Sequence, residues 1–249
     1  VASATAAAYT VDNSCRFNAG DSYLSRTSSG DNNSVGKWTF SCWIKRNKIT
    51  YESNIISFYD SNDLRSALRF DGDDKLRFYE VNGVTIVTKL TDRLFRDTSA
   101  FYHIVLAVDK TVASPDTQIY VNGEATTSWS TDDDYTQDES GTFNNAVDTY
   151  INTLNGTSGI AGQVMSHVHF VDGTKYAASD FGEFDEDSPT IWKPKDVSGL
   201  TFGDNGFYLD FQNSAELGTD VSGNSNTFTE NNLDATDQAT DTPTNNFCT

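Results

Sequence analysis

Residues 101–124 read FYHIVLAVDKTVASPDTQIYVNGE, and this stretch decides the fold. Over residues 101–108 the side chains are mostly apolar at both odd and even positions. This pattern predicts a strand that is buried on both faces, inside a packed sheet. Residues 118–121 form a second short strand, rich in β-branched and aromatic side chains. Asn122-Gly123 tolerates φ > 0 at both turn positions, which favours a tight hairpin into Glu124–Trp129.

Similar short segments lie on both sides of this hairpin. They are Ser14–Asn18, Ser22–Arg26, Trp38–Lys45, Asn54–Tyr59, Ala67–Phe70, Lys75–Val81, Val84–Leu90, Thr149–Leu154, Gln163–Val171 and Asn205–Phe211. Glycine turns such as Asp71-Gly72 and Asn82-Gly83 separate several of them, and only Tyr176–Phe181 suggests a helical turn. The pattern predicts an all-β fold, a two-sheet antiparallel sandwich of the jelly-roll kind.

The expected organisation is one sandwich over residues 12–212. A flexible N-terminal arm (1–11) precedes it, and a polar extension or linker (213–249) follows it. Within the sandwich, Trp129–Gly141 is predicted to be an acidic loop and Glu183–Gly199 an irregular segment. The expected core consists of Phe17, Trp38, Phe40, Ile44, Phe70, Ile104, Leu106, Ile119, Val168, Phe170 and Phe207.

The charge is divided unevenly along the chain. The formal net charge is −19; residues 1–130 carry 15 acidic and 14 basic side chains, whereas residues 131–249 carry 21 acidic and 3 basic ones. An anionic region of this kind repels nucleic acid and anionic lipid. It suits divalent cations or a basic partner, and it also serves as a plain solubility surface. No apolar run approaches the roughly 18 residues of a membrane span, so none is expected.

Several stretches together resemble the laminin-G-like domain of the concanavalin A-like lectin/glucanase group. They are CRFNAGDSYLSR (15–26), KWTFSCWIKR (37–46), FYHIVLAVDK (101–110), QIYVNGE (118–124) and GIAGQVMSHVHFVDG (159–173). The later segments resemble a variety of this domain in structural proteins of marine bacteriophages. The family includes sugar binders, protein binders, glycan hydrolases and structural modules, so the fold alone does not choose the function.

The resemblance implies a non-enzymatic virion structural or adhesion module, such as a tail fibre, appendage or capsid decoration. It would lie at the virion surface or outside the cell, with other virion proteins and further copies of itself as partners. Host-surface glycan is an expected ligand, and neither nucleic acid nor a membrane span is expected. The alternative is a polysaccharide-degrading glycoside hydrolase of the same fold.

A candidate carbohydrate site lies in the acidic stretch after residue 128. It consists of Trp129, Asp132, Asp133, Asp134 and Tyr135, because sugars are bound by aromatic stacking together with polar oxygens. Loops at the edge of a sandwich commonly carry function. A subunit contact, or no contact at all, explains the same residues.

A candidate calcium site lies in DVSGNSN, residues 220–226. Asp220, Asn224 and Asn226 supply carboxylate and amide oxygens, which are suitable calcium ligands. The alternative is a hydrogen-bonded turn without an ion.

The acidic run after Gly182 is the remaining candidate for catalysis. Glu183, Asp185 and Asp187 resemble the acidic trio of related glucanases, but the third member is one methylene shorter and the flanks suit a loop. We therefore expect no catalytic residues. His167 and His169 are spaced to share a strand face, yet a metal site needs a third ligand that the sequence does not single out.

Overall fold

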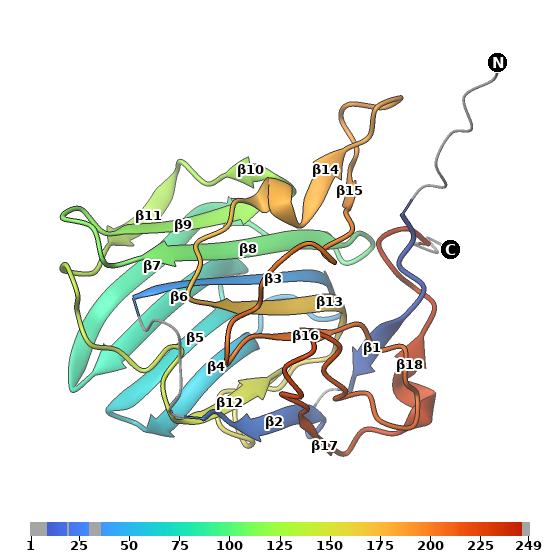
Figure 1. Cartoon of the computed structure of the whole chain (residues 1–249), viewed down its shortest axis with the longest axis horizontal. Coiled ribbons are helices and arrows are strands. Elements are labelled where there is room, and N and C mark those ends of the chain that lie inside the picture. Colours follow the sequence, from blue (N-terminus) through green and yellow to red (C-terminus); the bar gives the residue numbers. More distant parts are fainter. Residues whose placement is uncertain (1–8, 19, 30–35, 246–249) are drawn as a thin grey trace.

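The computed structural model describes residues 9–18, 20–29 and 36–245, which form a sandwich of two large antiparallel sheets (Figure 1). The first sheet contains β10 (Glu124–Ala125), β9 (Asp116–Val121), β8 (Tyr102–Asp109), β3 (Lys37–Arg46), β13 (Gln163–Asp172), β1 (Ser14–Phe17) and β18 (Gln238–Ala239), with β16 (Phe207–Leu209) also paired to β13. The second contains β11 (Trp129–Asp133), β7 (Val84–Leu94), β6 (Lys75–Asn82), β5 (Leu64–Phe70), β4 (Ser53–Ser61), β12 (Asp148–Ile151), β2 (Tyr23–Thr27) and β17 (Thr229–Asn231). The all-β sandwich fold is confirmed.

Helix is confined, within the described ranges, to two 3-10 turns, η1 (Ala178–Asp180) and η2 (Ala235–Asp237). The first falls inside the segment for which the sequence predicts a helical turn. No helix in these ranges is long and apolar enough to cross a membrane.

Residues 101–124 contain the two strands that the sequence predicts, β8 and β9. Strand β8 pairs with β9 on one side and β3 on the other, and nearly all of its side chains are buried. One face of β8 contributes Ile104 and Leu106 to the core between the sheets. On the other face, Val105 packs in a second cluster with later residues such as Phe181 and Phe202. The turn after β9 has φ of +51° at Asn122 and +82° at Gly123, as an Asn-Gly hairpin requires.

The core between the sheets is aromatic. The ring of Trp38 stacks on that of Phe143, with centroids 3.9 Å apart and an interplanar angle of 12°. All eleven side chains expected in the core are buried there: Phe17, Trp38, Phe40, Ile44, Phe70, Ile104, Leu106, Ile119, Val168, Phe170 and Phe207. Each aromatic ring buries roughly 150–250 Å², which makes these rings the main source of stability.

Two segments predicted to be a loop or irregular contain short strands. Trp129–Gly141 begins with β11, which pairs with β7 of the second sheet instead of continuing the hairpin from Gly123. The strand after that hairpin, β10, is only two residues long. The run Glu183–Gly199 contains β14 (Gly182–Phe184) and β15 (Trp192–Pro194), which pair as a separate two-stranded sheet. Strand pairing therefore overrides the polar composition of both segments; it is long-range for β11 and local for the hairpin of β14 and β15.

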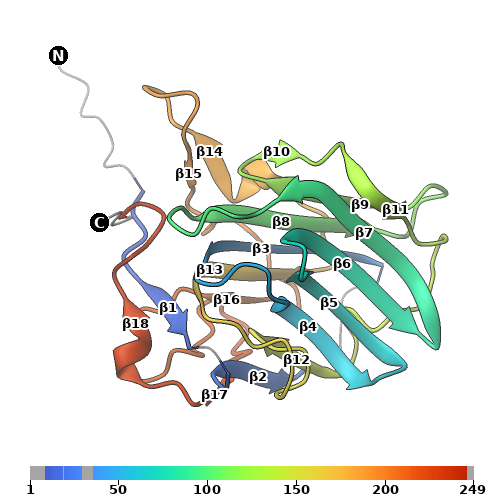
Figure 2. The same ribbon diagram turned by 180° about the vertical axis from the view of Figure 1, so that it is seen from behind.

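The C-terminal segment lies against both sheets in its described part. Strand β17 pairs with β2 and β18 pairs with β1, so residues after 213 complete the edge of each sheet (Figure 2). Leu217 and Phe228 are 1% and 2% exposed and belong to the core. Residues 1–8 of the expected arm, and Cys248 near the end, lie outside the described residues.

Candidate functional site

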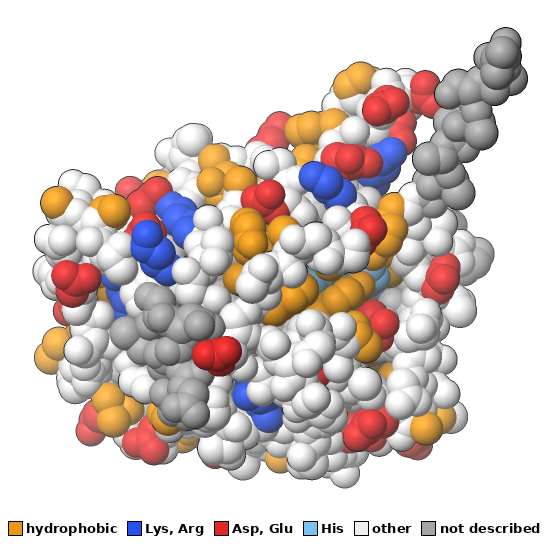
Figure 3. All heavy atoms as spheres, in the orientation of Figure 1, with side chains coloured by type: hydrophobic (Ala, Val, Ile, Leu, Met, Phe, Trp, Pro, Cys, Tyr) orange, Lys and Arg blue, Asp and Glu red, His pale blue; other side chains and the backbone are white. Residues whose placement is uncertain are grey.

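A hairpin made of β14 and β15 projects from the body of the sandwich (Figure 1). Its turn is held by the carboxylate of Asp185, which accepts hydrogen bonds from the backbone N–H of Asp187 at 3.0 Å and of Ser188 at 2.9 Å. We refer to residues 182–194 as the projecting hairpin. Figure 3 shows hydrophobic side chains near its base, next to acidic and basic ones.

Trp192 fixes this hairpin to the first sheet. A Cβ atom at Gly123 or Gly182 would come within 2.5 or 2.6 Å of its indole ring, so only glycine leaves room for the ring at both positions. The indole Nε1 also donates a hydrogen bond to Nδ1 of His103 at 2.9 Å. The base of the hairpin is therefore tied to β8 and to the Asn-Gly turn.

His103 is neutral in this setting. Its ring lies beside that of Trp43, with centroids 4.6 Å apart, and its Nε2 is 2.9 Å from Oγ of Ser41. Because Nδ1 accepts from the indole, Nε2 carries the proton and donates to the serine hydroxyl. Burial, assisted by nearby His167, lowers the pKa of His103 to about 3. His103 thus acts as a hydrogen-bonded support beneath Trp192.

Two clefts lie at the base of the hairpin, and Phe184 and Trp192 line both of them. The outer cleft has a volume of about 390 Å³. Its aromatic walls include Tyr120, and its polar groups come from Ser179, Glu183 and Lys195. The Lys195 ammonium donates to the carbonyl of Ser179 at 3.2 Å.

The inner cleft has a volume of about 250 Å³. Aromatic side chains also line it, together with a group of polar ones; its lining consists of Trp43, Arg93, Phe101, Val121, Asn122, Glu124, Phe184, Thr190 and Trp192. Concave sites with aromatic walls and a few placed polar groups are typical of small-molecule binding. Phe184 and Trp192 form a wall that the two clefts share.

The predicted carbohydrate residues after position 128 do not form such a surface. Tyr135 is 4% exposed, and its hydroxyl donates to the carboxylate of Glu80 in the interior. Burial raises the pKa of this phenol well above its usual value. Trp129 is half-buried against the core. The tyrosine ring is therefore not presented for stacking.

The acids of the same stretch have internal partners. Lys89 is held between Asp132, at 2.6 Å, and Asp134, at 2.9 Å. Asp133 is exposed on β11 and pairs in register with Thr88. These ion pairs anchor β11 to β7, which explains why an acidic stretch becomes a strand.

The predicted calcium residues form a hydrogen-bonded turn instead of a set of free oxygens. Asp220 accepts from the backbone N–H of Tyr208, Ser222 and Asn226 and from the Ser222 hydroxyl, at 2.7–2.9 Å. Oδ1 of Asn226 accepts from Arg26 at 2.7 Å.

The amide nitrogens of the same turn face backbone carbonyls. The Asn226 amide donates to Asp204 and Gly206, and the Asn224 amide donates to Gly206 at 2.9 Å. This arrangement does not fit calcium, because an ion would have to displace these bonds.

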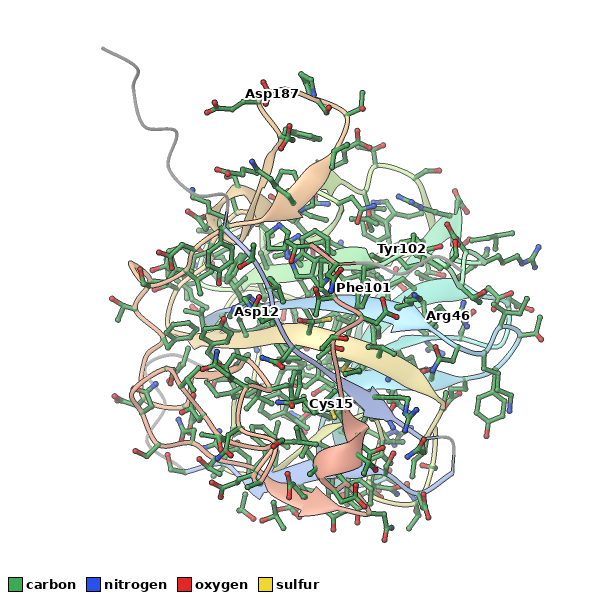
Figure 4. The ribbon with its side chains drawn as sticks, turned by 90° about the vertical axis from the view of Figure 1, so that its right-hand side faces the viewer. Asp12, Cys15, Arg46, Phe101, Tyr102 and Asp187 are labelled. Atoms are coloured by element: carbon green, nitrogen blue, oxygen red, sulfur yellow. The ribbon has the colours of Figure 1, made fainter. Side chains whose placement is uncertain are left out.

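Two members of the acidic trio share one lysine, and the third lies in the turn of the hairpin. Glu183 and Asp185 both contact the ammonium of Lys193, at 3.7 and 3.2 Å. The hydrogen bond from Lys193 and the one from the Ser188 N–H hold the pKa of Asp185 below its usual value. A general acid requires the opposite shift. Asp187 lies at the tip, far from Phe101 and Tyr102 in the body (Figure 4).

His167 and His169 are packed side chains. Their ring centroids are 5.8 Å apart, and the ring of Tyr208 lies 4.4 Å from that of His169. Burial lowers the pKa of His167 to about 4. The pairing of β13 with β3 has a β-bulge between Ser166 and His169, and His167 within this bulge has φ of +48°. Among the described residues, no three His, Cys, Asp or Glu side chains are placed to hold a metal ion.

Sequence reasoning missed Tyr120, Phe184 and Trp192 as a group. The available signal was the pair of large aromatic residues inside an otherwise acidic and proline-containing segment. Their meeting with the Asn-Gly turn is a long-range contact that no local pattern encodes.

The chain belongs to the concanavalin A-like lectin/glucanases superfamily, because the model of that family matches residues 18–178, more than half of the chain. No curated protein matches the sequence. One similar solved structure is a putative carbohydrate binding protein from Bacteroides ovatus, with 17% identity and a TM-score of 0.55. The match covers 91% of this chain and 61% of that one.

Two further solved structures are more distant. The heptameric SAP-like pentraxin from Limulus polyphemus is 15% identical, with a TM-score of 0.48, and the match covers 69% of this chain and 80% of that chain. The CBM40 of Ruminococcus gnavus IT-sialidase, bound to α2,3-sialyllactose, is 12% identical, with a TM-score of 0.44 and coverage of 63% and 91%. At these identities the likeness concerns the fold.

Proposed function

We propose that this chain is a non-enzymatic glycan-binding module and that the projecting hairpin carries its binding site. The observation behind this proposal is the wall formed by Phe184 and Trp192 between two clefts. Phe184 is 45% exposed, and its ring meets that of Trp192 edge-on, with centroids 4.9 Å apart. The C–H faces of a sugar ring stack on such aromatic surfaces.

The polar groups of the clefts complement this wall. Glu183 and Lys195 lie in the outer cleft, and Arg93, Asn122 and Glu124 lie in the inner one. Both hydrogen-bond donors and acceptors are therefore within reach of sugar hydroxyls. This combination suits an uncharged oligosaccharide that spans the hairpin.

The proposal is tested by calorimetric titration of the protein with a panel of uncharged oligosaccharides. Phe184→Ala should weaken binding by about ten-fold, because one of the stacking surfaces is lost. Val84→Ala is the matched control, since Val84 is 69% exposed at the start of β7 and lines neither cleft. Equal binding by both variants, with unchanged melting temperatures, would rule out the hairpin as the site.

The alternative role is hydrolysis of polysaccharide. The ion pairs of Glu183 and Asp185 with Lys193 argue against it, because they hold the pKa of Asp185 below its usual value, whereas the general acid of a glycoside hydrolase needs a raised pKa. We propose that the chain has no such activity. Release of reducing ends from laminarin, agar or carrageenan that disappears in Glu183→Gln would contradict this.

For the setting, we propose a structural or adhesion role at a virion surface, on the basis of the sequence resemblance to phage proteins. Other virion proteins and further copies of the chain would be its partners, and host glycan would be the ligand of the hairpin. Imaging of an intact particle tests this setting. The chain should occupy regular, symmetric positions with the hairpin directed outward.

A further inference from the structure

Two arginines lie directly opposite each other on the outer face of the second sheet. Strands β5 and β6 pair Arg69 with Arg77. Leu68 and Phe78 point into the core, so by alternation the two arginines point outward. Figure 2 shows β5 and β6 in the middle of the sheet nearest the viewer, whereas the projecting hairpin rises from the first sheet.

The two guanidinium groups share one aromatic ring. The central carbon of Arg69 lies 4.9 Å from the ring centroid of Tyr79, and that of Arg77 lies 4.8 Å from it. Tyr79 is only 5% exposed and packs with Ala67 and Leu154. The ring is therefore a fixed platform that holds both side chains in place.

Among the described residues, one carboxylate forms an ion pair with these two guanidinium groups, and the charges of Glu52 and Asp71 act on Arg77 from a longer distance. Nη1 of Arg69 contacts Glu52 at 2.6 Å, but Arg77 has no ion pair there. Nε of both arginines is buried without a hydrogen-bond partner in the same residues. Burial, followed by the nearby charge of Arg69, lowers the pKa of Arg77. Like charges placed directly opposite in a sheet are destabilising, so the pair weakens the fold on its own.

A bound oxyanion would offset the repulsion between the guanidinium groups of Arg69 and Arg77. Guanidinium groups bind carboxylate and sulfate oxygens in forked geometry, and charge-assisted bonds of this kind are stronger than neutral ones. Arg65 and Lys75 lie on the same two strands and by alternation on the same face, which makes this a basic area on an acidic protein. The partner is therefore expected to carry negative charge.

We propose that Arg69 and Arg77 bind a carboxylate or sulfate group of an acidic polysaccharide, at a second site on the opposite sheet from the projecting hairpin. The choice of a polysaccharide as the carrier rests on the proposed glycan-binding function. The oxyanion site itself rests on the arginine pair.

The test compares three ligands by calorimetric titration of the full chain: an oligogalacturonate, a sulfated dextran oligosaccharide and an uncharged dextran oligosaccharide. At least one acidic ligand should bind, and Arg77→Gln should weaken that binding by about ten-fold or more. Arg77→Lys should recover part of it, since the charge remains but the fork is lost. Glu52→Gln should strengthen it, because the internal competitor is removed.

Arg16→Gln is the matched control. It removes one positive charge from β1 in the other sheet, where Arg16 pairs with Asp237 at 3.7 Å. Arg77→Gln should also keep or raise the melting temperature, because it removes a like-charge contact, whereas a purely structural arginine would lower it. The carboxylate and sulfate arms identify which oxyanion is bound.

The proposal is wrong if neither acidic ligand binds, or if Arg77→Gln and Arg16→Gln lower the affinity equally. Failure of the hairpin proposal is distinct. It would appear as unchanged binding of uncharged oligosaccharide in Phe184→Ala, whereas Arg77→Gln should leave that binding intact in either case.

Discussion

Trp192 and His103 are joined by a hydrogen bond of 2.9 Å that connects a projecting hairpin to the strand on which the whole sandwich is built. The two residues are 89 positions apart in the sequence. The bond orients the indole at the base of both clefts and leaves the imidazole neutral. The candidate binding site and the stability of the sheet are therefore linked through this pair.

Replacement of Trp192 by Phe should both destabilise the chain and disturb the clefts. The change leaves the buried Nδ1 of His103 without its donor, which costs about 1–3 kcal/mol of unfolding free energy. Urea unfolding checks the loss, and oligosaccharide titration checks the site. Ile191→Ala, on the same hairpin but 55% exposed, should change neither. A Trp192→Phe variant as stable as the parent would show that the bond has no structural role.

The free energy of unfolding should fall as the pH drops below about 6.5. Burial holds the pKa of His103 at about 3 and that of His167 at about 4, whereas an unfolded chain titrates near 6.5. Below 6.5 the unfolded state therefore takes up protons that the folded state does not. Stability is fully present above this pH and is lost progressively towards pH 4 and 3, by up to about 1.4 kcal/mol per pH unit for each histidine.

The contributions of the histidines and of the carboxylates to the pH dependence of stability occur in different pH ranges and can therefore be distinguished. Carboxylates with lowered pKa values, such as Asp74 and Asp109, lose their contribution only as the pH falls below their ordinary value of 3.8. The denaturant midpoint of unfolding should therefore be lower at pH 6 than at pH 7.5, and lower again at pH 5. A flat profile between pH 7.5 and 5 would contradict the assignment.

Asp74→Asn should be strongly destabilising. Asp74 is fully buried, contacts Arg46 at 3.1 Å and Arg96 at 3.0 Å, and has φ of +66°, which asparagine also tolerates. Burial alone would raise its pKa, but hydrogen bonds from Thr50 N–H and Arg96 hold the pKa below its usual value.

The substitution removes the charge and replaces one acceptor oxygen with an NH2 group, so Arg46, 1% exposed, loses its ionised buried partner. The expected loss is about 3–5 kcal/mol in the free energy of unfolding. Chemical denaturation measures it. Asp73→Asn, at an exposed neighbouring position, serves as the control and should have little effect. A loss of the same small size in both variants would show that the buried pair is not needed.

Chelation should leave the melting temperature unchanged. Both carboxylate oxygens of Asp220 already accept hydrogen bonds from protein groups, so calcium would gain few free ligands there. A binding ion would raise the melting temperature through mass action. Thermal scans with EDTA and with added calcium make the comparison. A calcium-dependent rise that is lost in Asp220→Asn would restore the calcium assignment of Asp220, Asn224 and Asn226.

The sequence by itself determined the sandwich and its core. The apolar run over residues 101–108, the Asn122-Gly123 turn and the spacing of aromatic residues are local features. Local sterics and burial of apolar area translate them directly into strands and hairpins. This is why the buried residues from Phe17 to Phe207 could be listed in advance.

Only the tertiary structure decided where the polar and acidic segments go. Tyr135 turns inward to Glu80, Asp220 accepts a hydrogen bond from the backbone N–H of Tyr208, and Trp192 donates one to His103. The pairing of Arg69 with Arg77 depends on the register of two strands. Each outcome depends on which distant group satisfies a charge or hydrogen bond, and composition does not encode that choice. The fold was therefore predictable from local pattern, whereas the sites depend on long-range pairing.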